Sequence, residues 1–164
     1  MTQITLSKEQ NEPFEAIYER YVNMLFRVAL AYVKSRATAE DIVADAFLKL
    51  LKASVSFKSQ EHEKAWLLRT TINLCKNHQK HWWNRRADID EYQSLASSEE
   101  FRDDEVLKAV MELPERYKAA IYLYYYEGYD SKEIAELLEK PRSTILNHLS
   151  EARKLLRGVL ENEE

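Results

Sequence analysis

Glycine and proline are scarce in this chain. It holds only 2 Gly and 3 Pro among 164 residues, about 3% where an ordinary protein has roughly 12%. Because sandwiches and barrels need turn residues at every corner, an all-β fold is excluded. Gly128 and Gly158 are also too far apart for a Walker A loop or a GxGxxG dinucleotide site, which both need clustered glycines. The sequence therefore predicts an all-α protein.

The N-terminal half shows helical periodicity in three segments. Its apolar residues recur at the spacing of one helix face. Thr38 and Asp41 have the spacing of a capping box, which predicts a helix start at Thr38. Asp41 and Asp45 then share the face opposite the apolar one. The expected elements are helices over about 13–34, from residue 38 and over about 61–83, with a loop at 54–60.

The C-terminal half predicts a second set of helices after a linker. Residues 87–101 are acidic, contain serines and have no sustained period, as in a linker. Helical periodicity resumes at Val106. The expected helices end at Leu113, run over about 115–127 to a capping Gly128, open at Asp130 with Glu133, and run over about 142–160 after Pro141. We therefore expect two small helical domains, 10–86 and 103–160, joined by an acidic linker, 87–102.

Charge is unevenly distributed along the chain. The net charge is −4, but residues 62–86 hold six Lys and Arg against one Glu. Residues 87–105 hold eight Asp and Glu against one Arg. Such runs are usually solvated faces. A basic stretch that also carries Trp66, Trp82 and Trp83 favours contact with nucleic acid as well.

Residues 130–156 have the pattern of a helix-turn-helix. A capped short helix, a break at Pro141 and a second amphipathic helix with polar residues at its start are typical of a helix that enters the DNA major groove. Asn pairs with adenine, and Arg with guanine or phosphate. A helical hairpin inside a bundle is the alternative. The candidate DNA contacts are Arg142, Ser143, Thr144, Asn147 and His148.

The wider segment, Leu113 to Leu156, resembles region 4 of the sigma-70 family of bacterial RNA polymerase sigma factors. The matching motifs are LPER at 113–116, EG at 127–128, EIA at 133–135, Pro141, Thr144, Leu149 and AR at 152–153. The short linker is similar to that of the extracytoplasmic-function subfamily. The resemblance implies that the last helix, with Arg153 added to the candidates, recognises the minus-35 promoter element. It also implies that this half contacts the polymerase flap.

Phe14 to Arg86 resembles sigma region 2. The matching segments are AYV at 31–33, AEDIVADAFLKLLKA at 39–53 and KAWLLRTTINLCKNHQKHWWNRR at 64–86. The resemblance implies that the second segment docks on the clamp coiled coil of core RNA polymerase. The implied contacts are Asp41, Asp45 and Leu48, whereas Phe47 belongs to the buried face.

The third segment is similar to the family element that melts and captures the minus-10 strand. Unstacked bases need aromatic faces, polar side chains and cations, and loop 54–60 is where the family holds a flipped base. Partial burial of Trp66 in the core is the alternative for that residue. The implied minus-10 contacts are Trp66, Arg69, Thr70, Asn73, Lys76, Asn77 and Lys80.

The chain departs from the family pattern at several positions. Ala44 stands where the clamp helix usually carries Gln, and Asn77 replaces a common acidic residue. Glu139, Leu146 and His148 replace a usual Gly, a basic or polar residue and an Arg. The last two changes remove positive charge from the recognition helix, so minus-35 affinity or sequence is expected to differ from that of a typical member.

An enzyme and a stand-alone regulator are the rival functions. His62-Glu63 begins like HExxH but lacks the second His. Cys75, His78 and His81 would span one helix face and hold a metal, but no fourth ligand is evident. We therefore expect no catalytic residue, metal or cofactor. A stand-alone helix-turn-helix regulator would have no reason to present the helix at 41–47. A sigma-like subunit that needs a partner chain is a further alternative.

The expected location and partners follow from the same residues. A single cysteine, no apolar run long enough to span a membrane and no signal pattern at the N-terminus predict a cytoplasmic protein. The resemblance implies core RNA polymerase and promoter DNA, double- and single-stranded, as partners, and an anti-sigma factor as regulator.

Overall fold

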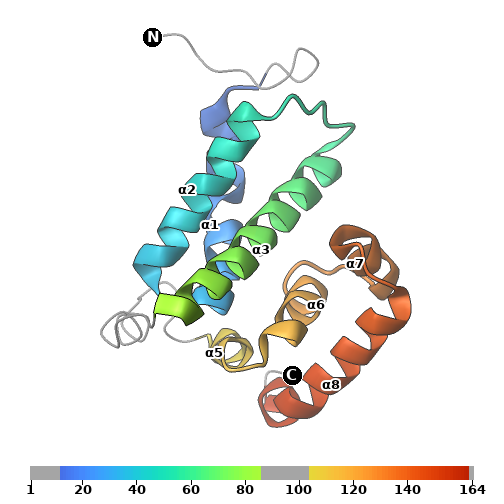
Figure 1. The fold of residues 1–164 in the computed structure, drawn as a ribbon. Coiled ribbons are helices and arrows are strands. Elements are labelled where there is room, and N and C mark those ends of the chain that lie inside the picture. The colour runs from blue at the N-terminus through green and yellow to red at the C-terminus, as the bar shows by residue number, and fades with distance from the viewer. Residues whose placement is uncertain (1–11, 86–103, 163–164) are drawn as a thin grey trace.

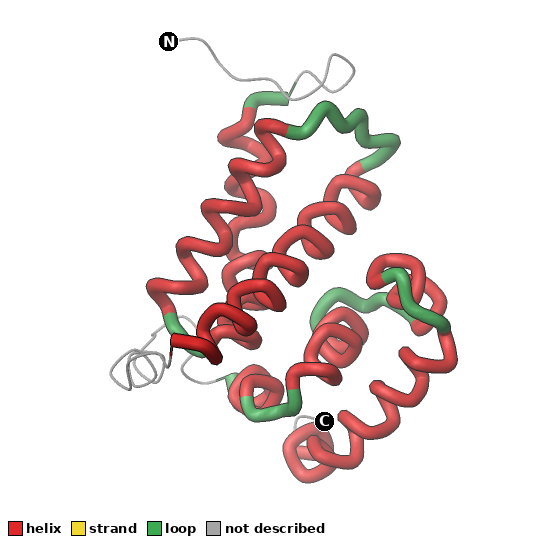
Figure 2. The backbone as a smooth tube through the Cα atoms, in the orientation of Figure 1, coloured by secondary structure: helices red, strands yellow, loops and turns green. Residues whose placement is uncertain are grey.

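The structure is a computed structural model that describes residues 12–85 and 104–162. These residues form seven helices, and Figure 2 shows no strand among them. The prediction of an all-α fold is confirmed for this part of the chain. Within it, every helix is too short or too polar to span a lipid bilayer. The whole predicted linker, 87–102, lies outside the described residues, and so do the side chains of Trp82 and Trp83.

The first three helices form a bundle around one apolar core. They are α1 (Phe14–Val33), α2 (Arg36–Lys52) and α3 (Gln60–Arg85). Each packs on the other two, as Figure 1 shows. Leu25, Leu68 and Ile72 are fully buried between them, and each such side chain contributes about 1.5–3 kcal/mol to folding. Helical periodicity thus located the bundle correctly.

The start of α2 differs from the prediction. Ser35, not Thr38, is the N-cap, and the Ser35 hydroxyl accepts a hydrogen bond from the Thr38 N–H at 3.3 Å. Both residue types make good caps, and the chain already turns at Lys34, which has φ 56°. The helix therefore begins one turn earlier, and Thr38 lies inside it.

The second group of helices packs around its own core. It comprises α5 (Glu105–Met111), α6 (Glu115–Tyr125), α7 (Ser131–Leu138) and α8 (Arg142–Asn162). The capping box at the start of α7 is confirmed: the Asp130 carboxylate accepts from the Glu133 N–H at 2.8 Å, and the Glu133 carboxylate accepts from the Asp130 N–H at 3.1 Å. The helix-turn-helix of α7 and α8 therefore forms as expected.

Gly128 does not cap α6 directly. The helix ends at Tyr125, two residues earlier than predicted, and Tyr126 is its C-cap. Gly128 lies in the turn that follows, with φ 74°, a left-handed conformation that favours glycine. The Tyr129 N–H then bonds back to the Leu123 carbonyl at 3.1 Å. Gly128 therefore redirects the chain toward α7.

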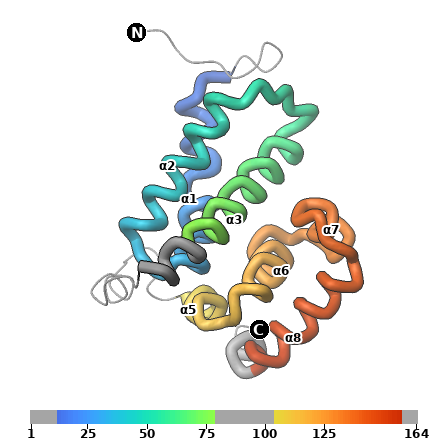
Figure 3. Tube along the Cα trace, viewed as in Figure 1, coloured from blue at the N-terminus to red at the C-terminus, as the bar shows by residue number. Residues whose placement is uncertain are grey.

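The two helix groups pack against each other along one side of the bundle. Helix α1 contacts α5 and α6, and α3 contacts α7. Figures 1 and 3 show α2 on the side of the bundle away from α6, α7 and α8. The outer face of α2, which carries Asp41, Asp45 and Leu48, is therefore open to solvent. The inner face of α3, which carries Arg69 and Lys76, lies toward the second helix group.

Candidate polymerase and nucleic-acid interfaces

Helix α2 divides sharply into a buried and an exposed face. Ala46, Phe47 and Leu50 are buried in the bundle, which confirms the expectation that Phe47 is structural. Asp41 and Asp45 are exposed, and Leu48 keeps 49% of its surface in contact with solvent. Neither carboxylate forms an ion pair with another residue of the described part of the chain. This face therefore offers two free negative charges beside an exposed apolar side chain.

A groove that the sequence did not reveal lies beside this face. It has a volume of about 230 Å³ and runs between α1 and α2. Ala44, where the family usually has Gln, lines it with Val43 and Glu40 from α2. Tyr18 from α1 lines it too and is 42% exposed. Tyr18 shares an apolar helix face with Val22, so its spacing in the sequence indicated a buried position. Its exposure extends the candidate face onto α1.

The predicted minus-10 residues lie along α3 in different states of exposure. Asn73 and Asn77 are exposed, and Thr70 is half-buried. Trp66 is half-buried and packs on the core, with its ring edge-on to Phe57 at 5.8 Å, so its alternative role as part of the core has support. Lys80 lies in α3 but outside the residues whose side chains the structure describes.

Two cations of this set are engaged by the second helix group. The Arg69 guanidinium forms an ion pair with the Glu139 carboxylate. Glu139, in place of the usual Gly, sits at the end of α7 with φ 55°. Lys76 lines a pocket together with residues of α6 and α8, and burial and the charge of Lys140 lower the pKa of its ammonium group. The inner face of α3 is therefore partly covered.

The predicted minus-35 residues lie on α8 as the spacing required. Arg142, Ser143 and Asn147 are exposed, whereas Thr144 and His148 are half-buried. Arg153 is exposed too, with its guanidinium 4.7 Å from the centre of the Tyr124 ring. The opposite face buries Ile145, Leu149 and Ala152. The structure thus brings these side chains onto one accessible helix, and their contacts with DNA remain predictions.

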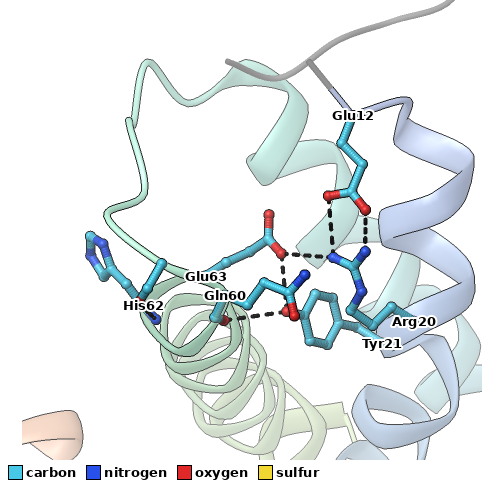
Figure 4. Close-up of polar contacts among 7 residues, drawn as sticks. Glu12, Arg20, Tyr21, Gln60, His62 and Glu63 are labelled. Atoms are coloured by element: carbon cyan, nitrogen blue, oxygen red, sulfur yellow. Dashed lines mark hydrogen bonds and ion pairs between the residues drawn. The ribbon is translucent and has the colours of Figure 1, made fainter. Parts of the chain in front are cut away.

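A polar network fixes the start of α3 beside loop 53–59 (Figure 4). Glu63 is 1% exposed and accepts a hydrogen bond from the Tyr21 hydroxyl at 3.0 Å. Arg20 approaches the same oxygen at 3.4 Å and also pairs with Glu12. Burial raises the pKa of Glu63 and raises that of Tyr21 to about 12. Glu63 thus holds α3 against α1, a role that its HExxH-like setting in the sequence did not show.

The loop before α3 has its own anchors. The Ser59 hydroxyl accepts a hydrogen bond from the His62 N–H at 3.1 Å, and His62 Nδ1 accepts one from the Lys58 N–H at 3.2 Å. Phe57, which belongs to the loop, is buried, and its ring lies edge-on to the His62 ring with the ring centres 5.3 Å apart. The segment that the resemblance assigns to a flipped base is therefore held by defined contacts.

Metal chemistry finds no support in the described side chains. Among them, no three His, Cys, Asp or Glu groups converge on one point. Cys75 is fully buried, and burial raises the pKa of its thiol, which opposes the thiolate form that metals bind. His81, whose spacing in the sequence places it on one helix face with Cys75 and His78, lies outside the described side chains.

Comparison with known proteins agrees with both halves of the structure. A family model described as Sigma-70 region 2 matches residues 17–86, and one described as Sigma-70, region 4 matches residues 103–156. The RNA polymerase sigma factor SigV of Bacillus subtilis is 32% identical over 145 residues, which cover 85% of this chain and 86% of the relative. The chain belongs to the extracytoplasmic-function group of the sigma-70 family.

More distant relatives of this sigma factor extend over nearly the same length. The ECF RNA polymerase sigma-E factor of Escherichia coli is 26% identical over 170 residues, 92% of this chain and 88% of the relative. The RNA polymerase sigma-H factor of Pseudomonas aeruginosa is 24% identical over 168 residues, 90% of this chain and 86% of the relative. In the structure, region 2 corresponds to α1–α3 and region 4 to α5–α8.

A buried polar cluster joins the two regions of this sigma factor. The Glu127 side chain, only 6% exposed, lies 3.5 Å from Arg27 and 3.1 Å from Lys64 of region 2. The Tyr122 hydroxyl accepts a hydrogen bond from Arg27 Nε at 3.1 Å and lies 3.1 Å from a Glu127 oxygen. Burial, and then the negative charge of Glu127, raises the pKa of Tyr122. Two cations and a hydroxyl thus surround the buried Glu127 carboxylate, and a buried charge needs such partners to offset the loss of water.

Lys118 forms a second buried contact between the regions. Its ammonium group donates a hydrogen bond to the Ala31 carbonyl, at the end of α1, at 2.7 Å. The residue is 3% exposed, and burial, reinforced by the charge of Lys34, lowers its pKa to about 8. Sequence reasoning missed Lys118 as well as Glu127. A lysine that interrupts the apolar stretch of α6 was the only signal.

Proposed function

We propose that this sigma factor uses three separate helices for its three tasks. The outer face of α2 docks on core RNA polymerase, α3 captures the opened minus-10 strand, and α8 recognises the minus-35 duplex. The family assignment states the overall activity, which is promoter-specific transcription initiation by RNA polymerase. The observation that carries the assignment of tasks is the separation of exposed residues on α2, α3 and α8.

The α2 face suits a docking site for a basic partner. Asp41 and Asp45 are exposed and form no ion pair with another described residue, and Leu48 adds exposed apolar area on the same helix. Opposite charges across such an interface guide association, and a central apolar contact adds affinity. The clamp coiled coil of the polymerase, implied by the resemblance, would need basic residues at this contact.

The α3 and α8 faces suit the two states of promoter DNA. Asn73 and Asn77 present amides beside the half-buried Trp66 on α3, and unstacked bases are bound by polar and aromatic groups of this kind. On α8, Asn147 and Arg142 are exposed near the helix start, where a recognition helix reaches base edges and phosphates. Single-stranded contact on one helix and duplex contact on the other follow from these side chains.

In the structure regions 2 and 4 pack against each other, and we call this the closed arrangement. It must open if the chain is to bind the minus-10 and minus-35 elements of one promoter at the same time. Minus-10 and minus-35 elements lie about 25 base pairs apart, which is roughly 85 Å of duplex. Lys76 of α3 and His148 of α8 line the same pocket in the structure. One duplex cannot bring both elements to adjoining walls of a single pocket. We therefore propose that regions 2 and 4 separate when the chain binds core polymerase.

In vitro transcription with core RNA polymerase and genomic DNA fragments tests the proposed function. The wild-type chain should produce transcripts from a discrete set of promoters. Asn147→Ala should change relative use of those promoters by about 1–3 kcal/mol, the value of one good bidentate base contact. Ser150→Ala, an exposed change on the same helix, is the control and should leave promoter choice unchanged. If Asn147→Ala behaves like the control, Asn147 does not recognise a base.

The alternative function is a regulator that binds DNA without the polymerase. Specific duplex binding by a chain that fails to bind core polymerase would favour it. The proposal assigns no catalytic step to this chain and places it in the cytoplasm, where bacterial polymerase works. Control by an anti-sigma factor remains a prediction from the resemblance, and copurification of a binding partner with the tagged chain would test it.

A further inference from the structure

A pocket of about 430 Å³ lies where region 2 meets region 4. Its walls come from α1, α3, α6, the end of α7, the turn before α8 and α8, so neither region forms it alone. The size is within the range of small-molecule sites. The lining side chains that concern us are Tyr32, Lys76, Glu115, Arg116, Lys140 and His148.

The pocket gathers positive charge. Lys76, Arg116 and Lys140 line it against one carboxylate, that of Glu115. In the described part of the chain, none of these three cations forms an ion pair with a carboxylate. The pocket lining therefore holds more positive than negative charge before any contribution from His148.

The cations are close enough to act on one another. After burial, the charge of Lys140 is the largest cause that lowers the pKa of Lys76. Burial and the charges of Lys140, Arg116 and Lys76 lower the pKa of His148. Helix α6 also begins at this pocket, and its N-cap, Pro114, provides no side-chain cap, so the positive end of the helix dipole adds to the same field. An anion would relieve this repulsion.

We propose that the pocket binds a small phosphate-bearing anion between regions 2 and 4. Phosphate fits better than a singly charged anion because several cations from different helices converge. The Arg116 fork and the Lys76 and Lys140 ammonium groups are the donors that proteins use for phosphate oxygens. A backbone phosphate of DNA offers the same chemistry, so the test must separate the two sources.

Binding at this position has a consequence for the closed form. Lys76 belongs to region 2 and Lys140 to region 4, so an anion that touches both links the regions and stabilises the closed arrangement by mass action. Lys76 and His148 are also candidate DNA contacts. The anion therefore competes with promoter DNA, a consequence that, unlike binding itself, rests on the proposed function.

Isothermal titration calorimetry of the full chain with inorganic pyrophosphate, at constant ionic strength and without polymerase, tests the site. We expect one saturable site. Lys76→Gln and Lys140→Gln should each weaken binding about tenfold, because each removes a charge-assisted contact. Lys132→Gln, an exposed change on α7 outside the pocket, should leave the dissociation constant unchanged. Since Lys76 is half-buried, Lys76→Arg serves as a second variant and should retain most of the affinity.

A parallel titration with a short single-stranded oligonucleotide distinguishes the phosphate sources. Competition between pyrophosphate and the oligonucleotide, with both weakened by Lys76→Gln, supports the proposal. Binding of the oligonucleotide without binding of pyrophosphate would assign these cations to DNA alone and overturn it. Pyrophosphate binding that depends on Lys140 but not on Lys76 would place the anion on region 4 only, which also overturns it. None of these results depends on whether the chain activates transcription.

Discussion

The outer face of α2 and the inner face of α3 belong to one bundle but differ in what covers them. On α2, Asp41, Asp45 and Leu48 face solvent and have no partner among the described residues. On α3, Arg69 pairs with Glu139 and Lys76 enters the pocket shared with region 4. The candidate polymerase face is thus available in this structure, whereas the candidate minus-10 face is partly occupied.

This difference gives an order of events. A partner that binds the outer face of α2 meets no obstacle from region 4. A partner that binds the inner face of α3 must first displace region 4 and break its polar contacts. We therefore expect polymerase to bind first and promoter DNA to follow, and the predictions below test the two faces separately.

Charge reversal on α2 should have the largest effect. Asp41→Lys with Asp45→Lys places like charges against a basic partner, which costs several kcal/mol, so affinity for core polymerase should fall at least about 100-fold. The free energy of unfolding should change by less than about 0.5 kcal/mol, as for other surface changes. Fluorescence anisotropy with labelled chain measures the affinity. Each single variant should be compared with Glu19→Lys, an exposed reversal on α1, and equal affinities would refute the assignment of the α2 face.

Removal of the buried Glu127 charge between the regions should have the second-largest effect. Glu127→Gln leaves Arg27 and Lys64 without their carboxylate, and breaking a buried pair costs about 3–5 kcal/mol. Because both cations gain water when the regions separate, the loss should appear mainly as opening, seen as a larger radius of gyration by small-angle scattering. Glu112→Gln is the control, since its pair with Lys34 also spans the regions but Glu112 is 64% exposed. A compact Glu127→Gln variant would show that the cluster does not hold the regions together.

Lys118 should make stability depend on pH. Its folded pKa of about 8 lies below its usual value of 10.5, so between these values the folded chain binds fewer protons than the unfolded chain. Lys118 should therefore contribute a rise of about 1–2 kcal/mol in the free energy of unfolding from pH 7.5 to 9.5. The buried Cys75 thiol, whose pKa is raised, contributes in the opposite sense at the upper end of this range. Above pH 10 the tyrosines with raised pKa values, such as Tyr21 and Tyr129 at about 12, reverse the slope.

Chemical denaturation across that pH range measures the Lys118 effect. Lys118→Met should lower the slope by the Lys118 contribution whatever its effect on absolute stability, because Lys76 and Cys75, whose pKa values are also shifted, titrate in both proteins. Lys108→Met, at an exposed position on α5, should retain the slope. A slope that Lys118→Met leaves unchanged would assign the rise to another group.

The smallest expected effect concerns the turn between α7 and α8. Glu139 has φ 55°, a conformation that costs a residue with a Cβ atom more than it costs glycine. Glu139→Gly should raise the free energy of unfolding by about 0.5–1 kcal/mol, measured by chemical denaturation, despite the loss of the exposed pair with Arg69. Glu139→Asn removes the charge but tolerates this conformation, so it separates the two contributions. Destabilisation by both changes would show that the Arg69 pair outweighs the backbone strain.

Periodicity and capping patterns predicted most of the helices, because they depend on residues close in the sequence. The bundle, the Asp130 cap of α7 and the exposed face of α8 followed from such spacing. The start of α2 did not, since Ser35 and Thr38 are equally good caps and only the turn at Lys34 decides between them. The end of α6 also differs from the prediction, because Gly128 lies in the turn after the helix and does not cap it.

The contacts between regions 2 and 4 could not be predicted from spacing. Glu127 and Lys118 resemble surface residues in the sequence, and they are buried only because helices of the other region pack over them. Glu63 is buried in a similar way by α1, within region 2. The packing between the regions also covers Arg69 and Lys76, which the resemblance placed on a free DNA-binding face. The sequence therefore predicted which residues form each face but not which face is covered in the free chain.

The distance between the two regions tests the central claim most directly. Labels at Glu19→Cys on α1 and Lys154→Cys on α8, both exposed positions, can be attached selectively because Cys75 is fully buried. Double electron–electron resonance should show one defined distance in the free chain and a much longer one after core polymerase and promoter DNA are added. The same distance as in the free chain in a complex that transcribes would contradict the account, because regions 2 and 4 would then work without separating.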